Sequence, residues 1–383
     1  MAESIEKNIE IINRALMKVA IVHEFLTRFG GAEQVLKNIS ELFPSAPIYV
    51  LLADESIVKK YFCNRDVRPS ALQKLPTWLR NRYNWLAVFM PSIVETWDLS
   101  EYDLVISSSS AFSKGVVVRT NTVHISYCHA PMRYAWDYRN QYLDDLSVGF
   151  VRRKLAKALL HYFRIWDRSA SDRVDFFIAN SKATQNKIKK YYQRESELIY
   201  PPVSTLGAVD VNISLNKFFL VVSQLTPYKR IDLAITTFNR SNLKLIIIGD
   251  GPDKKRLEKM ASSNIEILGW QSDQDVAKYF RDCYAYLMPG EEDFGISAIE
   301  AMTYGKPVLA YGQGGATETV LSGINGELFS EQKPEILADG LRRLMNNYAN
   351  YSPLVIRKWS EKFSKDRFKN SLEEYINSKV TSK

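Results

Sequence analysis

The chain has 383 residues, of which 46% are hydrophobic and 25% charged, a composition typical of a soluble globular protein with room for two domains. No apolar run reaches the roughly 18 residues of a membrane-spanning helix, and the N-terminal stretch lacks the basic region and long apolar run of a secretory signal. Three cysteines without metal-ligand spacing favour a reducing cytoplasm, and we expect residues 1–16 to form a short amphipathic extension before the fold.

Short apolar segments rich in Val and Ile alternate with helical patterns along the chain. They are bounded by Gly, Pro or Ser, which indicates parallel sheets with helices on both faces. We therefore predict two doubly wound α/β domains in tandem, joined by the proline-containing linker 200–212. The predicted strands cover residues 18–25, 48–53, 103–110, 122–129 and 174–181 in the first half, and 217–225, 244–251, 265–270, 285–290 and 307–312 in the second.

Positive charge is concentrated in the first half of the chain. Residues 1–200 carry 28 Lys+Arg against 21 Asp+Glu, or +7, whereas residues 201–383 carry 23 against 22, or +1. The excess lies in 74–90, 151–168 and 181–194, and the first two of these mix bases with aromatic residues and leucine. Such stretches suit either helices that touch anionic lipid or ordinary amphipathic helices with solvated lysines. No motif that reads RNA or DNA accompanies the charge, so nucleic acid is not an expected partner.

Three loops have the composition of anion-binding turns. Gly30 and Gly31 stand between the first strand and a helix, where backbone amides and the helix N-terminus attract an anion. The plain alternative at this position is a turn with a good helix cap. The segment "GDGPDKKRLEK" is a second such loop, and a third leads into a helix expected from Gly295 to Gly305.

Two glutamates bracket the start of that third helix. Glu292 lies in the preceding loop and Glu300 on the second helical turn, so both carboxylates can face one cleft. Carboxylates beside an amide-rich site suit a ligand that carries hydroxyl groups next to a phosphate. A purely structural pair would leave charge unpaired in an apolar region, at a cost of several kcal/mol.

The stretch 289–318 resembles the signature of retaining GT-B glycosyltransferases of family 4, whose E-x7-E pattern Glu292 and Glu300 match. "GGAEQVL" resembles the glycine loop of the family's first domain, and "YKRIDLAI" resembles its phosphate-binding segment. "YCHAPMRYAWD" (127–137) is similar to the histidine-bearing segment of the mannosyltransferase-like branch that builds bacterial O-antigens and exopolysaccharides. The resemblance extends over nearly the whole chain from Met17 onward.

The resemblance implies a GT-B fold, in which two Rossmann-like doubly wound domains face each other across a cleft. It implies an acceptor-binding domain over residues 1–200 and a nucleotide-sugar-binding domain over 201–355. A C-terminal helix over 356–383 is expected to cross back to the first domain, with Trp359 and Phe363 as its anchors there.

The same resemblance implies roles for the residues of the second domain. Lys229 is expected to bind the donor diphosphate, Glu292 to lie by the donor sugar and Glu300 to accept from the ribose. The backbone from Phe294 through Gly295 and Ile296 to Ser297 is expected to meet sugar and phosphate. Gly269 and Trp270, at a strand end, are expected to flank the base.

In the first domain, Gly30 and Gly31 are expected to let the glycine loop close on the diphosphate. His129 is expected near the anomeric carbon, with its main chain or imidazole on the transferred sugar, and His23 ends the first strand close to the glycine loop. No bound metal or cofactor is expected, because amides and bases neutralise the leaving diphosphate.

One position departs from the family pattern. Gln224 stands where relatives usually carry an arginine, so the phosphate receives a neutral donor in place of a charged fork. Lys229 is then expected to supply most of the side-chain charge, with Arg230 or Arg133 as substitutes for the missing arginine.

Other classes fit less well. "GQGGAT" and "GDGPDK" fail the dinucleotide fingerprint at Thr317 and Lys254, and no P-loop motif is present. The acidic "DQD" (273–275) fits a helix start better than a metal-binding motif. A GT-B sugar-nucleotide epimerase and a non-catalytic GT-B binding subunit remain as alternatives.

The expected partners are a nucleotide-sugar donor and a glycan or lipid-linked glycan acceptor. Both GDP-mannose and a UDP-sugar such as UDP-glucose suit the donor site. The basic, aromatic stretches favour peripheral contact with an anionic membrane, and the expected location is the cytoplasm, at the inner face of the plasma membrane.

Overall fold

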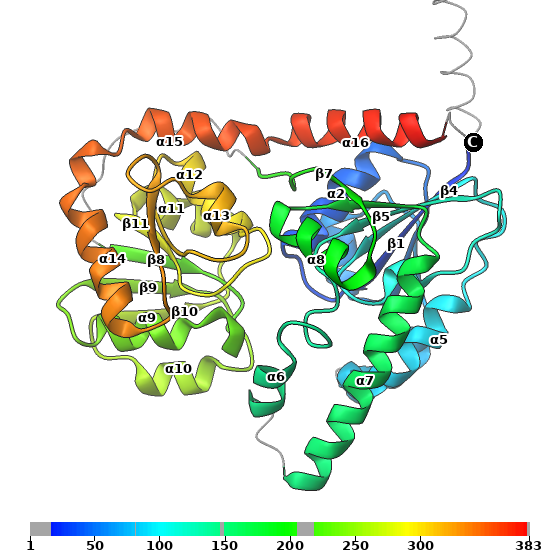
Figure 1. Ribbon diagram of the computed structural model, residues 1–383, viewed down its shortest axis with the longest axis horizontal. Helices are drawn as coiled ribbons and strands as arrows, with labels where there is room; N and C mark the ends of the chain where they lie inside the picture. Colours follow the sequence, from blue (N-terminus) through cyan, green and yellow to red (C-terminus); the bar gives the residue numbers. More distant parts are fainter. Residues whose placement is uncertain (1–16, 81, 146–148, 205–217, 381–383) are drawn as a thin grey trace, which may run out of the picture. The chain divides into compact units, whose positions relative to one another are not determined.

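The computed structural model describes residues 17–80, 82–145, 149–204 and 218–380, so the expected extension over 1–16 and most of the linker lie outside the described residues (Figure 1). The chain forms two compact units. Unit 1 contains the described residues of Met1–Asn180, Thr184–Ile199 and Lys369–Lys383. Unit 2 contains those of Ser181–Ala183 and Tyr200–Phe368.

Unit 1 is built on a parallel sheet of seven strands in the order β3-β2-β1-β4-β5-β6-β7. Strands are added on both sides of β1, so the order reverses between β1 and β4. The strands are β1 (Val19–Leu26), β2 (Ile48–Ala53), β3 (Val67–Pro69), β4 (Leu104–Ser109), β5 (Val123–Cys128), β6 (Phe176–Ala179) and β7 (Ser196–Leu198). The α-helices are α2 (Gly31–Leu42), α3 (Glu55–Tyr61), α4 (Thr77–Arg80), α5 (Met90–Glu95), α6 (Arg139–Asp145), α7 (Phe150–Asp172) and α8 (Lys182–Tyr192).

Unit 2 repeats this architecture with six parallel strands in the order β10-β9-β8-β11-β12-β13. Its order reverses between β8 and β11. The strands are β8 (Phe218–Val222), β9 (Lys244–Ile248), β10 (Ile265–Gly269), β11 (Ala285–Met288), β12 (Val308–Tyr311) and β13 (Gly326–Phe329). The α-helices are α9 (Ile231–Phe238), α10 (Lys254–Met260), α11 (Asp273–Asp282), α12 (Ile296–Thr303), α13 (Ala316–Thr319), α14 (Pro334–Asn346) and α15 (Pro353–Ser360), and α16 (Lys365–Val380) follows.

The prediction of two doubly wound α/β sheets is confirmed, because each predicted strand coincides with a strand of the structure. The apolar runs are strands because burial on both faces of a parallel sheet requires continuous Val, Ile, Leu and Phe, and these side chains form the cores. Three strands were not predicted: β3, β7 and β13 each lie at a sheet edge, where a short strand needs fewer apolar residues.

Two helical predictions need correction. Residues 74–90 do not form one amphipathic helix, because Leu75 is extended before Pro76 and the segment breaks into η1 (Ala71–Lys74), α4 and η2 (Tyr83–Phe89). The C-terminal segment is also broken, at η6 (Glu361–Phe363).

Trp359 lies before that break and Phe363 within it, and both pack within unit 2. The indole nitrogen of Trp359 donates to the carbonyl of Thr319 at 3.0 Å, and the ring of Phe363 is buried against Phe294. They therefore do not anchor the helix to unit 1. The residues that belong to unit 1 are those of α16 from Lys369 onward, where Lys369 pairs with Glu41 at 2.6 Å.

Among the described residues, no helix is long and apolar enough to cross a membrane.

Candidate active site

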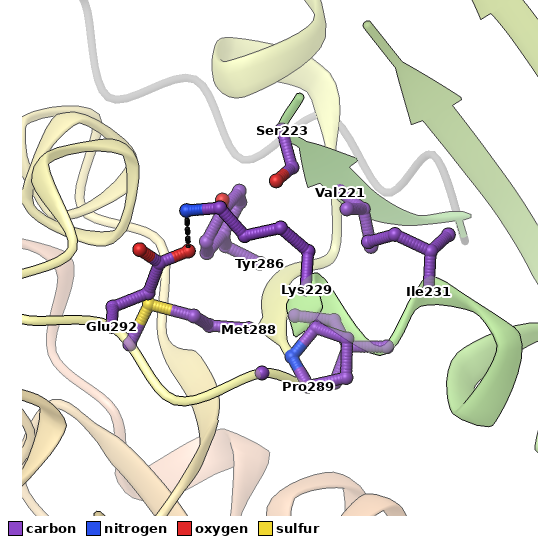
Figure 2. Close-up of a pocket in the computed structure, with 10 residues that line it drawn as sticks. Val221, Ser223, Lys229, Ile231, Tyr286, Met288, Pro289 and Glu292 are labelled. Atoms are coloured by element: carbon purple, nitrogen blue, oxygen red, sulfur yellow. Dashed lines mark hydrogen bonds and ion pairs between the residues drawn. The ribbon is translucent and has the colours of Figure 1, made fainter. Parts of the chain in front are cut away.

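In doubly wound sheets, ligands bind where the strand order reverses, beyond the carboxyl ends of the strands. In unit 2 this point lies between β8 and β11, so the loops that follow these two strands meet there. The first loop contains Lys229 and the second contains Glu292, and the two side chains form an ion pair. Figure 2 shows them reaching toward one another, with Ser223 and Tyr286 beside them. Their side chains are 15% and 18% exposed, so the pair is mostly buried.

Close contacts between backbones hold this pair in place. A Cβ atom at Gly290 would lie 2.7–2.8 Å from backbone atoms of Lys229, which leaves room only for glycine. On the other side, a Cβ atom at Gly314 would lie 2.2 Å from the carbonyl oxygen of Glu292, and the amide of Gly315 donates to that oxygen at 2.8 Å. The charged side chains are thus positioned by backbone that cannot move apart without losing these contacts.

The helix predicted after Gly295 is present as α12. Gly295 has φ = +88°, a left-handed conformation that turns the loop into the helix and that glycine adopts without strain. The amides of Ile296 and Ser297, at the first two positions of the helix, donate to no described residue. They supply the unpaired N–H groups that attract an anion.

Glu300 lies on the second turn of α12, as its spacing predicts. Its side chain is partly buried, and no described residue donates a hydrogen bond to the carboxylate. Burial raises the pKa of Glu300 to about 7, and the negative charge of Asp273 adds to the shift. Glu292 and Glu300 thus flank the start of one helix, but they differ in environment, because only Glu292 has a cationic partner.

The other predicted residues of unit 2 lie along the same edge of the sheet. Gly269 ends β10, the edge strand, with φ = +72°, and Trp270 beyond it is 68% exposed. Gln224 is half-buried in the loop after β8. The guanidinium of Arg230 binds Asp232 at 3.3 Å and Gln332 at 3.0 Å, and its role as a substitute for the missing arginine stays a prediction.

Unit 1 has a second polar cluster at its own reversal point, between β1 and β4. The buried carboxylate of Glu24, on β1, accepts from the four consecutive amides of residues 110–113 at 2.7–3.2 Å. The hydroxyl groups of Ser109 and Ser113 donate to the same oxygen. This single side chain therefore satisfies the backbone of the whole loop that leaves β4.

A buried ion pair holds the far side of this loop. Lys114 pairs with Asp167 of α7, and both side chains are almost completely buried. Asp167 also accepts from Trp136 and Tyr192, each at 2.8 Å. The histidine-bearing segment 127–137 is fixed to α7 and α8 through these bonds.

Gly30 and Gly31 lie at the start of α2, as predicted. The amide of Gly30 donates to the carboxylate of Glu33 at 2.8 Å, which supports a capped helix start. The amides of Gly31 and Ala32 donate to no described residue, so the turn also retains the N–H groups of an anion site.

His129 follows β5, and its ring lies 2.8 Å from the hydroxyl of Ser108. His23 contacts Ser108 as well, at 3.1 Å, and it faces Glu33 at 3.7 Å.

The structure brings Lys229, Glu292, Gly295 and Glu300 together in unit 2, and Gly30, His23 and His129 along one edge of unit 1. Sequence reasoning missed Glu24, Ser108 and Gly290. A run of serines at the end of a predicted strand was the available signal for Ser108. The described residues contain no group of three or more His, Cys, Asp or Glu side chains placed to hold a metal ion, and the expectation of metal-independent chemistry stays a prediction.

Comparisons with known proteins agree with this architecture. Residues 211–361 match the family Glycosyl transferases group 1, and residues 29–205 match Glycosyltransferase Family 4. Together the two matches cover most of the chain. The chain therefore belongs to the glycosyltransferases that they describe, which are transferase enzymes with the two-domain GT-B fold.

Among curated relatives, the chain is 31% identical to Uncharacterized glycosyltransferase MJ1178 of Methanocaldococcus jannaschii, over 48% of this chain and 53% of that protein. The chain spans about half the length of the first such relatives it matches. It is 26% identical to Alpha-1,3/1,6-mannosyltransferase ALG2 of Saccharomyces cerevisiae, over 96% of this chain and 86% of that protein. A crystal structure of HepE from Anabaena, in complex with UDP and glucose, has a TM-score of 0.70 at 19% identity and covers 94% of this chain and 100% of that one, which shows the fold.

The raised pKa of Glu300 predicts a stability effect with a defined sign. The carboxyl ionises near 4.5 when unfolded and near 7 when folded, so between these values the folded state binds more protons. Stability therefore falls as pH rises through this window. We expect Glu300→Gln to be more stable than the native chain at pH 8, by about 1–3 kcal/mol, and equally stable at pH 4.

Urea unfolding at both pH values measures this difference. Glu361→Gln, at an exposed position, is the matched control and should change stability at neither pH. A glutamine variant at position 300 that is less stable at pH 8 would show that the charged carboxylate is favoured where it lies.

Proposed function

We propose that this protein is a retaining glycosyltransferase that moves a hexose from a nucleotide-diphosphate sugar to a glycan or lipid-linked glycan, in bacterial polysaccharide biosynthesis. The observation that carries the proposal is the group at the reversal point of unit 2. There the ammonium of Lys229 and the carboxylate of Glu292 lie on adjoining loops, and a second carboxylate and two N-terminal amides lie on the first two turns of α12. This set can bind a diphosphate and the hydroxyl groups on either side of it.

The chemistry requires stabilisation of a leaving phosphate. Breaking the anomeric C–O bond builds negative charge on the diphosphate, and positive character develops on the sugar. Lys229 and the amides of Ile296 and Ser297 supply fixed positive groups for the phosphate, at no cost of reorganisation. Glu292 lies beside Lys229 and faces the sugar in this arrangement. No described residue is assigned as a nucleophile, and retention follows from attack on the face that the leaving phosphate occupies.

Support for the donor comes from two directions. The long match to a mannosyltransferase and the resemblance of segment 127–137 favour GDP-mannose. The similarity in fold to a protein that binds UDP favours a UDP-sugar such as UDP-glucose. Incubating the purified protein with each donor and a lipid-linked acceptor, followed by product analysis, tests the proposal. A free epimerised sugar nucleotide, or donor binding without turnover, would overturn it.

The surface of α7 supports a membrane-bound acceptor. Its buried face packs on the core through Leu160, Phe163 and Trp166, yet a second apolar stripe faces outward. The outward stripe consists of Val151, Leu155, Tyr162 and Ile165, which are 69%, 66%, 42% and 59% exposed. Exposed Arg152, Lys154 and Lys157 flank it. An apolar stripe flanked by bases fits the interface of an anionic membrane, and we place the protein at the inner face of the plasma membrane.

The departure at Gln224 predicts unequal roles for two neighbouring donors. We expect Lys229→Ala to lower turnover by about 10²–10³, as the loss of one preorganised charged donor does. Gln224→Ala should cost roughly tenfold, because a neutral hydrogen bond contributes about 1 kcal/mol. Turnover is measured with saturating donor. Lys244→Ala is the control, since Lys244 begins β9 at the opposite end of the sheet and pairs with Glu266 on the surface. Greater damage from the Gln224 variant would mean that the phosphate is held differently.

The α7 stripe predicts salt-sensitive membrane binding. We expect the protein to sediment with vesicles that contain phosphatidylglycerol and to leave them at high salt, since each base contributes about 1 kcal/mol near an anionic surface. Leu155→Asp with Ile165→Asp should abolish this binding. Leu354→Asp with Val355→Asp changes two exposed apolar residues of α15 and should leave it intact. Equal sedimentation with pure phosphatidylcholine vesicles would contradict the proposal.

A further inference from the structure

One serine in unit 1 lies between two imidazole rings. Ser108 is on β4, and its Cα pairs in register with that of His23 on β1. Its hydroxyl oxygen is 3.1 Å from Nδ1 of His23 and 2.8 Å from Nε2 of His129. Ser108 is completely buried, His23 is 2% exposed, and His129 is half-buried.

The protons of His23 follow from its neighbours. Nδ1 also lies 3.1 Å from the carbonyl oxygen of Ser108, which can only accept, so Nδ1 carries a hydrogen. Nε2 faces the carboxylate of Glu33 at 3.7 Å. Burial lowers the pKa of His23, but the hydrogen bond and charge of Glu33, the charge of Glu24 and the Ser108 carbonyl outweigh it, and the pKa is raised.

The hydrogen on Nδ1 of His23 determines which atom donates in the hydrogen bond between Ser108 and His129. Because His23 donates toward Ser108, the hydroxyl oxygen receives that contact through a lone pair, and its own hydrogen is available to Nε2 of His129. Nε2 then accepts, and the ring of His129 carries its hydrogen on Nδ1.

The main chain of His129 is already engaged. Its amide donates to the carbonyl of Ser109 at 2.8 Å, and its carbonyl accepts from Asn180 at 2.9 Å and from Thr184 at 3.3 Å. The ring also meets Tyr127 edge to face, with centroids 5.3 Å apart. Of the two contributions expected from His129, the imidazole is therefore the one that its surroundings orient.

We propose that Ser108, held by the His23–Glu33 pair, is a positioning residue that fixes His129 as an Nδ1–H donor. In the proposed glycosyl transfer, on which this role rests, His129 then presents an N–H at the ligand edge of unit 1 and does not act as a base. Glu33 also accepts from Gly30, so the same chain of bonds links the glycine turn to His129.

The chain contains its own control for this proposal. Ser107, the preceding residue of β4, points to the other face of the sheet, where its hydroxyl lies 2.9 Å from Nε2 of His124. Both residues of that pair are completely buried. Ser107→Ala removes a serine–histidine bond of the same kind from the same strand, away from the reversal-point cluster.

Nitrogen NMR of the ¹⁵N-histidine-labelled full chain tests the tautomer directly, since the chain has only four histidines. We expect His129 to show a protonated Nδ1 and an unprotonated Nε2. In Ser108→Ala this pattern should change, with kcat about tenfold lower and KM unchanged, as for the loss of one hydrogen bond in the transition state. In Ser107→Ala only the His124 signals should change, and kcat should stay at the native value.

Three results would overturn the proposal: a protonated Nε2 on His129 in the native chain, an unchanged His129 pattern in Ser108→Ala, or an equal loss of kcat in Ser107→Ala. The native spectrum decides the tautomer even if Ser108→Ala does not fold. The native spectrum also decides the tautomer without any substrate. A native chain that transfers no sugar from GDP-mannose or UDP-glucose would refute the proposed function, and the spectrum would still test the positioning of His129.

Discussion

Each loop that leaves the carboxyl end of a parallel strand must find partners for its backbone polar groups, and both candidate clusters depend on how this is done. Unit 1 uses a side chain: the carboxylate of Glu24 gathers the four amides of residues 110–113. Unit 2 uses close approach of backbone to backbone at Gly290 and Gly314. In both units the contact lies where the strand order reverses, so the ligand edge of each sheet is also its most constrained part.

The way in which each unit pairs its loop backbone determines which charged side chains remain available to a ligand. A carboxylate enclosed by amides cannot also serve a ligand, so Glu24 is structural although it lies at the favoured edge of the sheet. In unit 2 the amide of Gly315 bonds the backbone carbonyl of Glu292, and the charged side chains of Lys229 and Glu292 remain in the pocket. Because their backbones are locked by glycines, these charges are positioned before any ligand arrives, which is the condition for electrostatic catalysis.

Features that depend on local sequence could be predicted, whereas most features that depend on contacts between distant segments could not. Strands and the helix after Gly295 depend on local pattern, and both were predicted. The packing of Trp359 and Phe363 within unit 2 depends on where neighbouring segments lie, and it was missed. The break at Pro76 is local and was also missed, although the proline itself was the available signal. Gly290 is required by a residue 61 positions away, and Ser108 matters only because β1 and β4 pair in one register. No periodic pattern in the sequence indicates contacts of this kind. The edge strands escaped detection for the opposite reason, because few apolar residues suffice there.

Burial acts in the same direction on the ionisable groups of the two clusters, yet the outcomes differ. It favours the neutral form of both Glu300 and His23. For Glu300 no described cation opposes it, and the pKa rises to about 7. For His23 the carboxylates of Glu33 and Glu24 outweigh it, and the pKa is raised. The two residues therefore differ in their charged neighbours and not in the effect of burial. A buried group with polar and charged partners is fixed in orientation by them, as His23 is by Ser108 and Glu33, whereas a group without such partners is held only by its own helix. The cluster in unit 1 is therefore suited to orienting the neutral imidazole of His129 as a donor. The carboxylates of unit 2 are suited to accepting hydrogen bonds from the hydroxyl groups of a ligand.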